Sequence, residues 1–130
     1  MSIKITRVEG TKLKAEVSGF EIISGQVDEN TKPEGPSPGK LMVASLGLCA
    51  GLYAATFLKR HNIPDKGLTV EVASTDARNP SRASSFEVKV SVKAELSEQQ
   101  RDTMMAYVRA CWVGNTLKGN PEITYTLNVE

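Results

Sequence analysis

One segment limits what this chain can fold into more than any other: Leu41–Leu58 runs for 18 residues without a charged side chain. Its length would allow a short membrane span, and Gly47 and Gly51 have the small-residue spacing found in packed membrane helices. About half of the segment, however, consists of Ala, Gly, Ser, Thr, Cys or Tyr. We therefore expect a helix over about residues 39–60 that is buried on most sides in a water-soluble core.

The patterns outside this helix mostly predict strands, because apolar and polar residues alternate in short runs bounded by turn residues. Three such runs lie between residues 2 and 24, and one lies at each of 68–73, 86–94 and 123–129. Residues 26–39 contain three Pro and two Gly and are expected to form a loop, with Pro38 in the first turn of the helix.

A second helix is expected to open at Ser97, where Ser97 and Gln100 match a capping box. Its apolar residues keep helical spacing as far as Cys111. The predicted element order is β-β-β-α-β-β-α-β, and strands that alternate on one face are typical of antiparallel sheets in the α+β class. The length of 130 residues fits a single domain spanning residues 1–130.

The long helix is too apolar to show one side to water, so we expect a second copy of the chain to cover it in a homodimer. Four small residues form a ridge along it: Ala44, Gly47, Gly51 and Ala55. Such a ridge lets another element approach closely, and it fits either packing on a sheet or contact between the helices of a dimer.

The composition excludes several function classes. Lys and Arg number 16 against 15 Asp and Glu, a balance that predicts neither nucleic-acid binding nor attraction to an anionic membrane. Two Cys and one His are too few for a four-ligand zinc site or a disulfide-stapled secreted scaffold. The first ten residues do not resemble a signal peptide. We expect a cytoplasmic protein without a metal or cofactor.

The two cysteines are the residues that could be either reactive or inert. Cys49 lies in the middle of the long helix, beyond the reach of the dipole at its start, and apolar surroundings disfavour the thiolate form. It would need a nearby cation to act as a nucleophile, and otherwise it is an inert buried side chain. The sequence does not rank the arginines that could serve: Arg7, Arg60, Arg78, Arg82, Arg101 and Arg109.

Two stretches of the chain resemble a known family. Residues 35–63, GPSPGKLMVASLGLCAGLYAATFLKRHNI, resemble the central helix of the osmotically inducible protein C (OsmC) and organic hydroperoxide resistance (Ohr) superfamily. Residues 110–129, ACWVGNTLKGNPEITYTLNV, resemble the second cysteine segment and closing strand of that family. The placement of Cys49 and Cys111 is the most specific part of the match, and we identify the chain as a divergent member.

The resemblance implies an intertwined α+β homodimer, with antiparallel sheets around two long central helices, and a thiol peroxidase of the stress response. Cys49 would attack an organic hydroperoxide and Cys111 would resolve the sulfenic acid to a disulfide, which a dithiol reductant would reduce. An apolar pocket would favour fatty or aryl hydroperoxides. The residues expected to line it are Leu46, Leu52, Tyr53 and Trp112.

The chain departs from the family pattern around the first cysteine. Peroxidase members carry a Glu just ahead of the central helix, which orients an activating Arg, whereas this chain has Gly39 and Lys40 there. Trp112 replaces the Pro that usually follows the second cysteine. The alternative is therefore a non-peroxidatic member that binds a small apolar or acyl-bearing ligand in the dimer cleft. A purely structural or interaction domain is a third reading.

Overall fold

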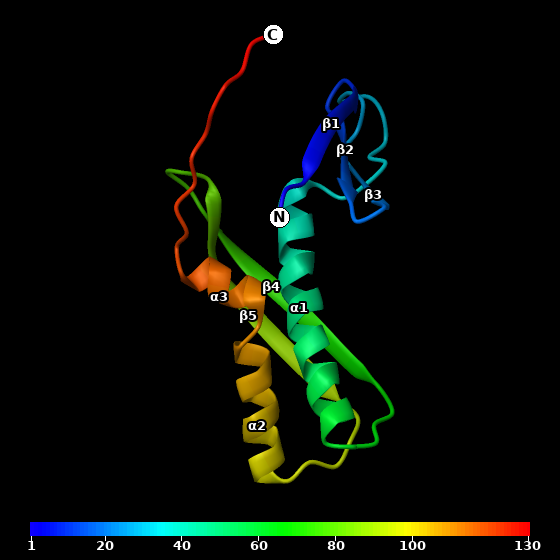
Figure 1. Ribbon diagram of the computed structural model, residues 1–130, viewed down its shortest axis with the longest axis vertical. Helices are drawn as coiled ribbons and strands as arrows, with labels where there is room; N and C mark the ends of the chain where they lie inside the picture. Colours follow the sequence, from blue (N-terminus) through cyan, green and yellow to red (C-terminus); the bar gives the residue numbers. More distant parts are fainter. The chain divides into compact units, whose positions relative to one another are not determined.

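The computed structural model describes residues 1–130, which form two compact units, Met1–Ala44 and Ser45–Glu130. The boundary lies within α1 (Pro38–Arg60), the long helix that Figure 1 draws in cyan-green. The prediction of a single domain is not tested by this division and stays a prediction.

The first unit contains a three-stranded antiparallel sheet, as the alternating patterns predict. Its strands lie in the order β1 (Lys4–Glu9), β2 (Lys12–Val17) and β3 (Phe20–Ser24). The turn between β1 and β2 requires a glycine, because Gly10 has a φ of +56° and any Cβ there would collide with the carbonyl oxygen of Val27.

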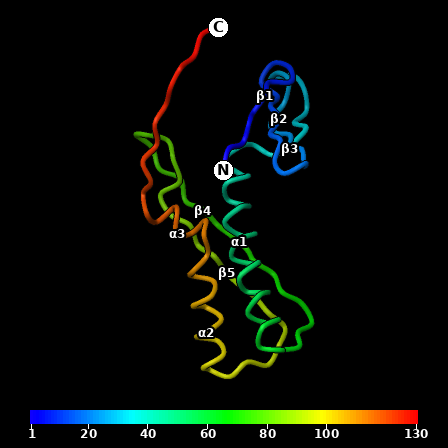
Figure 2. Tube along the Cα trace, in the orientation of Figure 1, coloured from blue at the N-terminus to red at the C-terminus, as the bar shows by residue number.

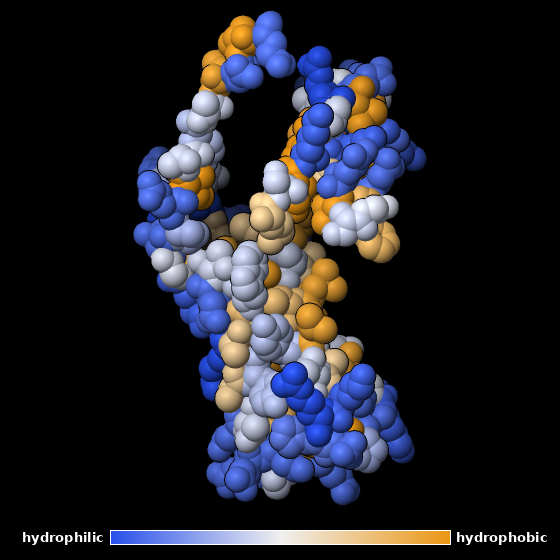
Figure 3. All heavy atoms as spheres, in the orientation of Figure 1, coloured by the Kyte–Doolittle hydropathy of each residue, from blue (hydrophilic) through white to orange (hydrophobic).

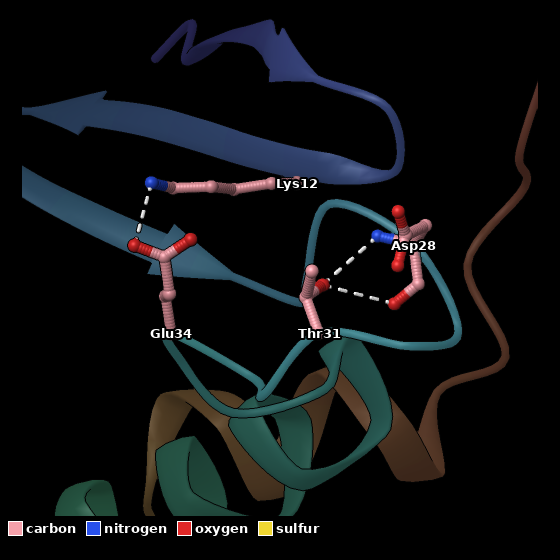
Figure 4. Close-up of polar contacts among 4 residues, drawn as sticks. All are labelled: Lys12, Asp28, Thr31 and Glu34. Atoms are coloured by element: carbon pink, nitrogen blue, oxygen red, sulfur yellow. Dashed lines mark hydrogen bonds and ion pairs between the residues drawn. The ribbon is translucent and has the colours of Figure 1, made fainter.

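The loop that follows β3 is held to the sheet by polar contacts (Figure 4). The ammonium group of Lys12 lies 2.8 Å from the carboxylate of Glu34. The Asp28 amide donates to the Thr31 hydroxyl oxygen at 3.1 Å, and that hydroxyl donates to the Asp28 carbonyl at 3.0 Å. The loop then enters α1 at Pro38, the first-turn position that the sequence predicts for it.

The second unit is built on an antiparallel pair, β4 (Leu68–Ala77) and β5 (Arg82–Val92). Valines pair across it, with Val70 opposite Val90 and Val72 opposite Val88. These four side chains are half-buried while the intervening residues are exposed, which matches the alternation in the sequence.

The small residues of α1 pack against this sheet. A Cβ added at Gly47 would lie 3.0 Å from the Val72 Cγ2 atom, and one at Gly51 would lie 3.4 Å from Val70 Cγ2. Of the two readings of the small-residue ridge, the structure therefore shows helix-on-sheet packing for these two glycines. α1 and the valines share one hydrophobic core with α2 (Glu98–Arg109). The buried residues of this core are Ala50, Ala54, Phe57, Leu58, Met104 and Val108.

The expected capping box of α2 is confirmed. The Gln100 amide donates to the Ser97 hydroxyl oxygen at 3.1 Å, and the Gln100 side-chain oxygen accepts from the Ser97 amide at 2.9 Å. The reciprocal bonds fix where α2 starts, and its buried residues Met104 and Val108 then face the core.

The region after α2 differs from the expectation. A short helix, α3 (Trp112–Lys118), follows, and Cys111 is its N-cap instead of the last residue of α2. The amide of Gly114 donates to the Cys111 sulfur at 3.3 Å and so supports the first turn of α3.

Residues 123–129, expected as a closing strand, pair with no other strand and run without secondary structure (Figure 2). Their alternating apolar side chains are exposed, with Tyr125 at 88%. A strand needs a neighbour to bond its amides and carbonyls, and this single chain presents none to this segment.

The expectation that α1 is buried on most sides is met only in part. Leu48 is 74% exposed and Leu52 is 63% exposed, and Figure 3 shows hydrophobic atoms over the middle of the helix. α1 is also long and apolar enough to cross a membrane, but the core helices of soluble proteins can have the same length and composition. The packing of its other side on β4 supports a core helix.

We predict that Gly47→Leu lowers the free energy of unfolding by about 1–3 kcal/mol, because the new side chain would push α1 away from Val72. Gly39→Leu is the matched control, since a Cβ there meets nothing within 4 Å. Urea denaturation of both variants measures the difference. Equal stability of the two variants would contradict the packing of α1 on β4.

Candidate functional site

The two cysteines, 62 positions apart in the sequence, lie side by side in the second unit. Cys49 projects from the middle of α1 and is partly exposed, whereas Cys111 is buried at the start of α3. The two thiols lie close enough for Cys49 to affect the pKa of Cys111. Both thiols are free, so the structure shows the reduced form of a close dithiol.

Backbone bonds on both sides of Cys111 hold its sulfur in place. Its amide donates to the Val108 carbonyl at 3.2 Å, at the end of α2, and its carbonyl accepts from the Asn115 amide at 2.9 Å, in α3. The Asn115 side chain also donates to the Ala110 carbonyl at 3.3 Å. Cys111 is thus the junction between two helices, and the sulfur caps the second.

The surroundings of Cys111 favour its neutral form. Burial raises the pKa of the Cys111 thiol, and the neighbouring Cys49 thiol raises it further. The amide of Gly114 at the start of α3 acts in the opposite direction, because it donates to the sulfur and stabilises a thiolate. The net effect is a raised pKa, so Cys111 is a thiol at neutral pH. No Arg or Lys is among the groups that shift it.

Of the four residues expected to line a pocket, three lie near the cysteines or a groove. Leu46 is buried, and its Cδ1 atom lies close to Gly114 beside the Cys111 sulfur. Leu52 and Tyr53 line a groove one turn of α1 beyond Cys49. Trp112 is 62% exposed and is not among the residues that line this groove.

The groove lies between α1 and α2 and has a volume of about 550 Å³. The residues that line it are Leu52, Tyr53, Thr56, Arg60, Ala106, Tyr107 and Ala110. The sequence predicts only Leu52 and Tyr53 of these as lining residues, and it offers Arg60 only as one of the candidate arginines. Helical spacing already places Thr56 on the face of α1 that carries Cys49 and Tyr53, and the same spacing extends this face to Arg60.

An aromatic cluster supports the floor of the groove. The rings of Phe57 and Tyr107 meet edge to face, with centroids 5.3 Å apart, and His61 stacks on Phe57 at 4.4 Å. The His61 Nδ1 atom lies 3.1 Å from the Phe57 carbonyl oxygen. No group of three or more His, Cys, Asp or Glu residues lies together in a way that could hold a metal ion.

A sequence model described as OsmC-like protein matches residues 29–126, which include both cysteines and the groove. The chain belongs to the OsmC-like family. Comparison with curated proteins gives no significant match.

Solved structures show the same fold. A Psychrobacter arcticus protein, described as an osmotic stress induced and detoxification response protein, is 25% identical over 89% of this chain and 87% of its own, with a TM-score of 0.74. An OsmC-like protein from Mycoplasma pneumoniae is 19% identical over 92% and 87%, with a TM-score of 0.76. An OsmC-like hydroperoxide resistance protein from Jannaschia is 19% identical over 98% and 91%, with a TM-score of 0.62.

These comparisons confirm two expectations: membership of the OsmC/Ohr superfamily as a divergent member, and an α+β fold with antiparallel sheets of the OsmC type. Solved structures of the same fold include proteins described as hydroperoxide resistance proteins. The roles of individual residues are proposals.

We predict that an alkylating agent such as iodoacetamide modifies Cys49 before Cys111, because Cys49 is partly exposed while Cys111 is 2% exposed. Since the pKa of Cys111 is raised, its modification rate should increase only at a more alkaline pH than that of an ordinary thiol. Mass mapping of peptides over a pH series measures both rates. Faster modification of Cys111 at neutral pH would contradict this description of the site.

Proposed function

We propose that the protein reduces organic hydroperoxides through Cys49 and Cys111. The observation that carries the proposal is the closeness of the two thiols, one on α1 and one at the start of α3. Membership of the OsmC-like family supports it, as do the hydroperoxide resistance proteins among the solved structures of the same fold.

The surroundings of the two thiols favour different roles. Cys49 is the more accessible, so its thiolate attacks the terminal oxygen of the hydroperoxide, the O–O bond breaks, and an alcohol leaves after protonation. Cys49 becomes a sulfenic acid. The Cys111 sulfur then attacks the Cys49 sulfur, a disulfide forms, and water is released. An external dithiol returns both cysteines to thiols by exchange and is itself oxidised.

Activation of Cys49 is the step in which this chain departs most from the family pattern. The first turn of α1, which holds Gly39 and Lys40, contains no acidic residue. That departure, together with an open apolar groove beside the dithiol, favours the second candidate: a member that binds a small apolar or acyl-bearing molecule without turnover. The closeness of the two thiols favours the first candidate, because binding alone does not require a dithiol.

We predict that reduced protein mixed with equimolar cumene hydroperoxide loses both thiols within seconds, as measured by stopped-flow mixing and thiol counting. Cys49→Ser should abolish the reaction, because it removes the attacking sulfur. Cys111→Ser should still consume one equivalent of hydroperoxide and stop at the sulfenic acid, which dimedone traps.

Survival of both thiols for minutes would reject the peroxidase and leave the binding function. The Cys111→Ser variant separates the two steps, because a serine keeps an oxygen at the cap position of α3 while removing the resolving sulfur. Loss of the first step in this variant would reject the assignment of Cys49 as the sole attacking residue.

We further propose that the protein works as a cytoplasmic homodimer. Two apolar surfaces of the single chain support the dimer: the exposed residues of α1, such as Leu48, and the alternating residues of segment 123–129. A partner chain would cover the first and offer the second a strand neighbour. A dithiol that must be returned to thiols after each reaction needs a reducing compartment, which supports the location.

Native mass spectrometry tests the dimer, and we expect twice the 14.1 kDa chain mass at micromolar concentration. Leu48→Glu should shift the protein toward the monomer, because it places a charge in the apolar surface of α1. The matched control is Thr69→Glu, at an exposed position of β4. A monomeric unmodified protein at this concentration would contradict the proposal.

A further inference from the structure

We propose that the groove between α1 and α2 binds the acyl chain of an anionic ligand, and that Arg60 binds its carboxylate. The inference rests on the proposed function for what happens at Cys49, but the binding site stands on the groove itself. Arg60 would be a specificity-determining residue: it selects long-chain substrates that carry a carboxylate over neutral ones of the same length.

The groove runs along the same face of α1 as the attacking cysteine. Cys49, Tyr53 and Arg60 share this face by helical spacing, and Tyr53 and Arg60 both line the groove. Eleven positions separate Cys49 from Arg60 in the helix, a rise of about 16 Å. The walls between them are supplied by Leu52, Ala106 and Ala110, so the space suits an apolar chain.

Arg60 is the only charged residue that lines the groove, and it has no ion-pair partner within the chain. All ion pairs of the structure lie among residues 12–34 of the other unit. An arginine that borders an apolar groove without a partner attracts a carboxylate, which its planar guanidinium can bind through two parallel hydrogen bonds.

A cation at the C-terminal end of a helix often donates hydrogen bonds to the last carbonyls, but here backbone amides already make these bonds. The last carbonyls of α1 accept hydrogen bonds from backbone amides: Phe57 from His61 at 3.0 Å, Lys59 from Asn62 at 3.2 Å and Leu58 from Ile63 at 3.0 Å. The C-terminal end of the helix therefore does not depend on the guanidinium as a cap.

Two tyrosines complete the polar part of the groove. The hydroxyl groups of Tyr53 and Tyr107 make no hydrogen bond to another residue of the chain, and both residues line the groove. They can donate to a ligand oxygen while their rings contact an alkyl chain. The groove thus combines apolar walls, two free hydroxyl donors and one unpaired cation, which together match an acyl chain with a terminal carboxylate.

The spacing also predicts which part of the ligand meets the thiol. With the carboxylate on Arg60, an extended alkyl chain of roughly a dozen carbons covers the distance of about 16 Å to Cys49. A hydroperoxide group at that depth would reach the sulfur. A substrate such as cumene hydroperoxide lacks the carboxylate, so its reduction would not depend on Arg60.

The test compares Arg60→Gln with Lys59→Gln, which removes the same charge from the neighbouring exposed residue outside the groove lining. Binding of dodecanoate, below its micelle concentration, is measured by calorimetric titration. Peroxidase rates are measured with a long-chain fatty acid hydroperoxide, its methyl ester and cumene hydroperoxide. We expect Arg60→Gln to weaken dodecanoate binding about tenfold and to remove the preference for the acid over the ester.

Lys59→Gln should leave both readouts within about twofold of the unmodified protein. Equal losses in the two variants would overturn the proposal, since they would show an effect of overall charge. Absence of dodecanoate binding would also overturn it and would indicate that a second chain fills the groove. If no hydroperoxide is reduced, the proposed function fails, while the dodecanoate titration still decides whether Arg60 binds carboxylates.

Discussion

The contact between two glycines of α1 and the valines of β4 is the interaction on which the arrangement of the second unit depends. Gly47 and Gly51 have no side chains, so the helix backbone lies close to Val70 and Val72. This close approach places Cys49 on a different side of the helix, where the end of α2 and the start of α3 pass. The position of the dithiol therefore follows from where α1 can approach the sheet.

The second half of the site depends on a break between helices. Cys111 lies between the end of α2 and the start of α3, and it caps α3. Its hydrogen bonds to the backbone of both helices fix the position of its sulfur. Burial then keeps this sulfur neutral, while Cys49 remains accessible. Two thiols with such different surroundings suit successive steps of one reaction: the accessible one meets the substrate, and the buried one meets the product of the first step.

Much of this fold could be predicted from the sequence because its signals are local. The capping box at Ser97, the loop before Pro38 and the alternation in β5 each depend on neighbouring residues, and all three are found in the structure. The sequence does not predict helix α3, because its cap is a cysteine, which is a rare capping residue.

The remaining differences depend on contacts that a sequence pattern does not contain. Segment 123–129 has the alternation of a strand, but pairing requires a neighbour that this chain does not supply to it. The sequence offers the cysteines as candidates and the family resemblance pairs them, but only the fold shows that the two thiols lie close together. The groove was found in part, because its α2 wall lies far away in the sequence from its α1 wall.

The central claim is that Cys49 and Cys111 form one reactive pair within a single chain. Mild oxidation of dilute protein with diamide, followed by peptide mass mapping under non-reducing conditions, tests it most directly. The account predicts a disulfide that joins the Cys49 and Cys111 peptides of the same chain, with the loss of two hydrogens and no covalent dimer. Disulfides between chains, or two thiols that remain free, would contradict it.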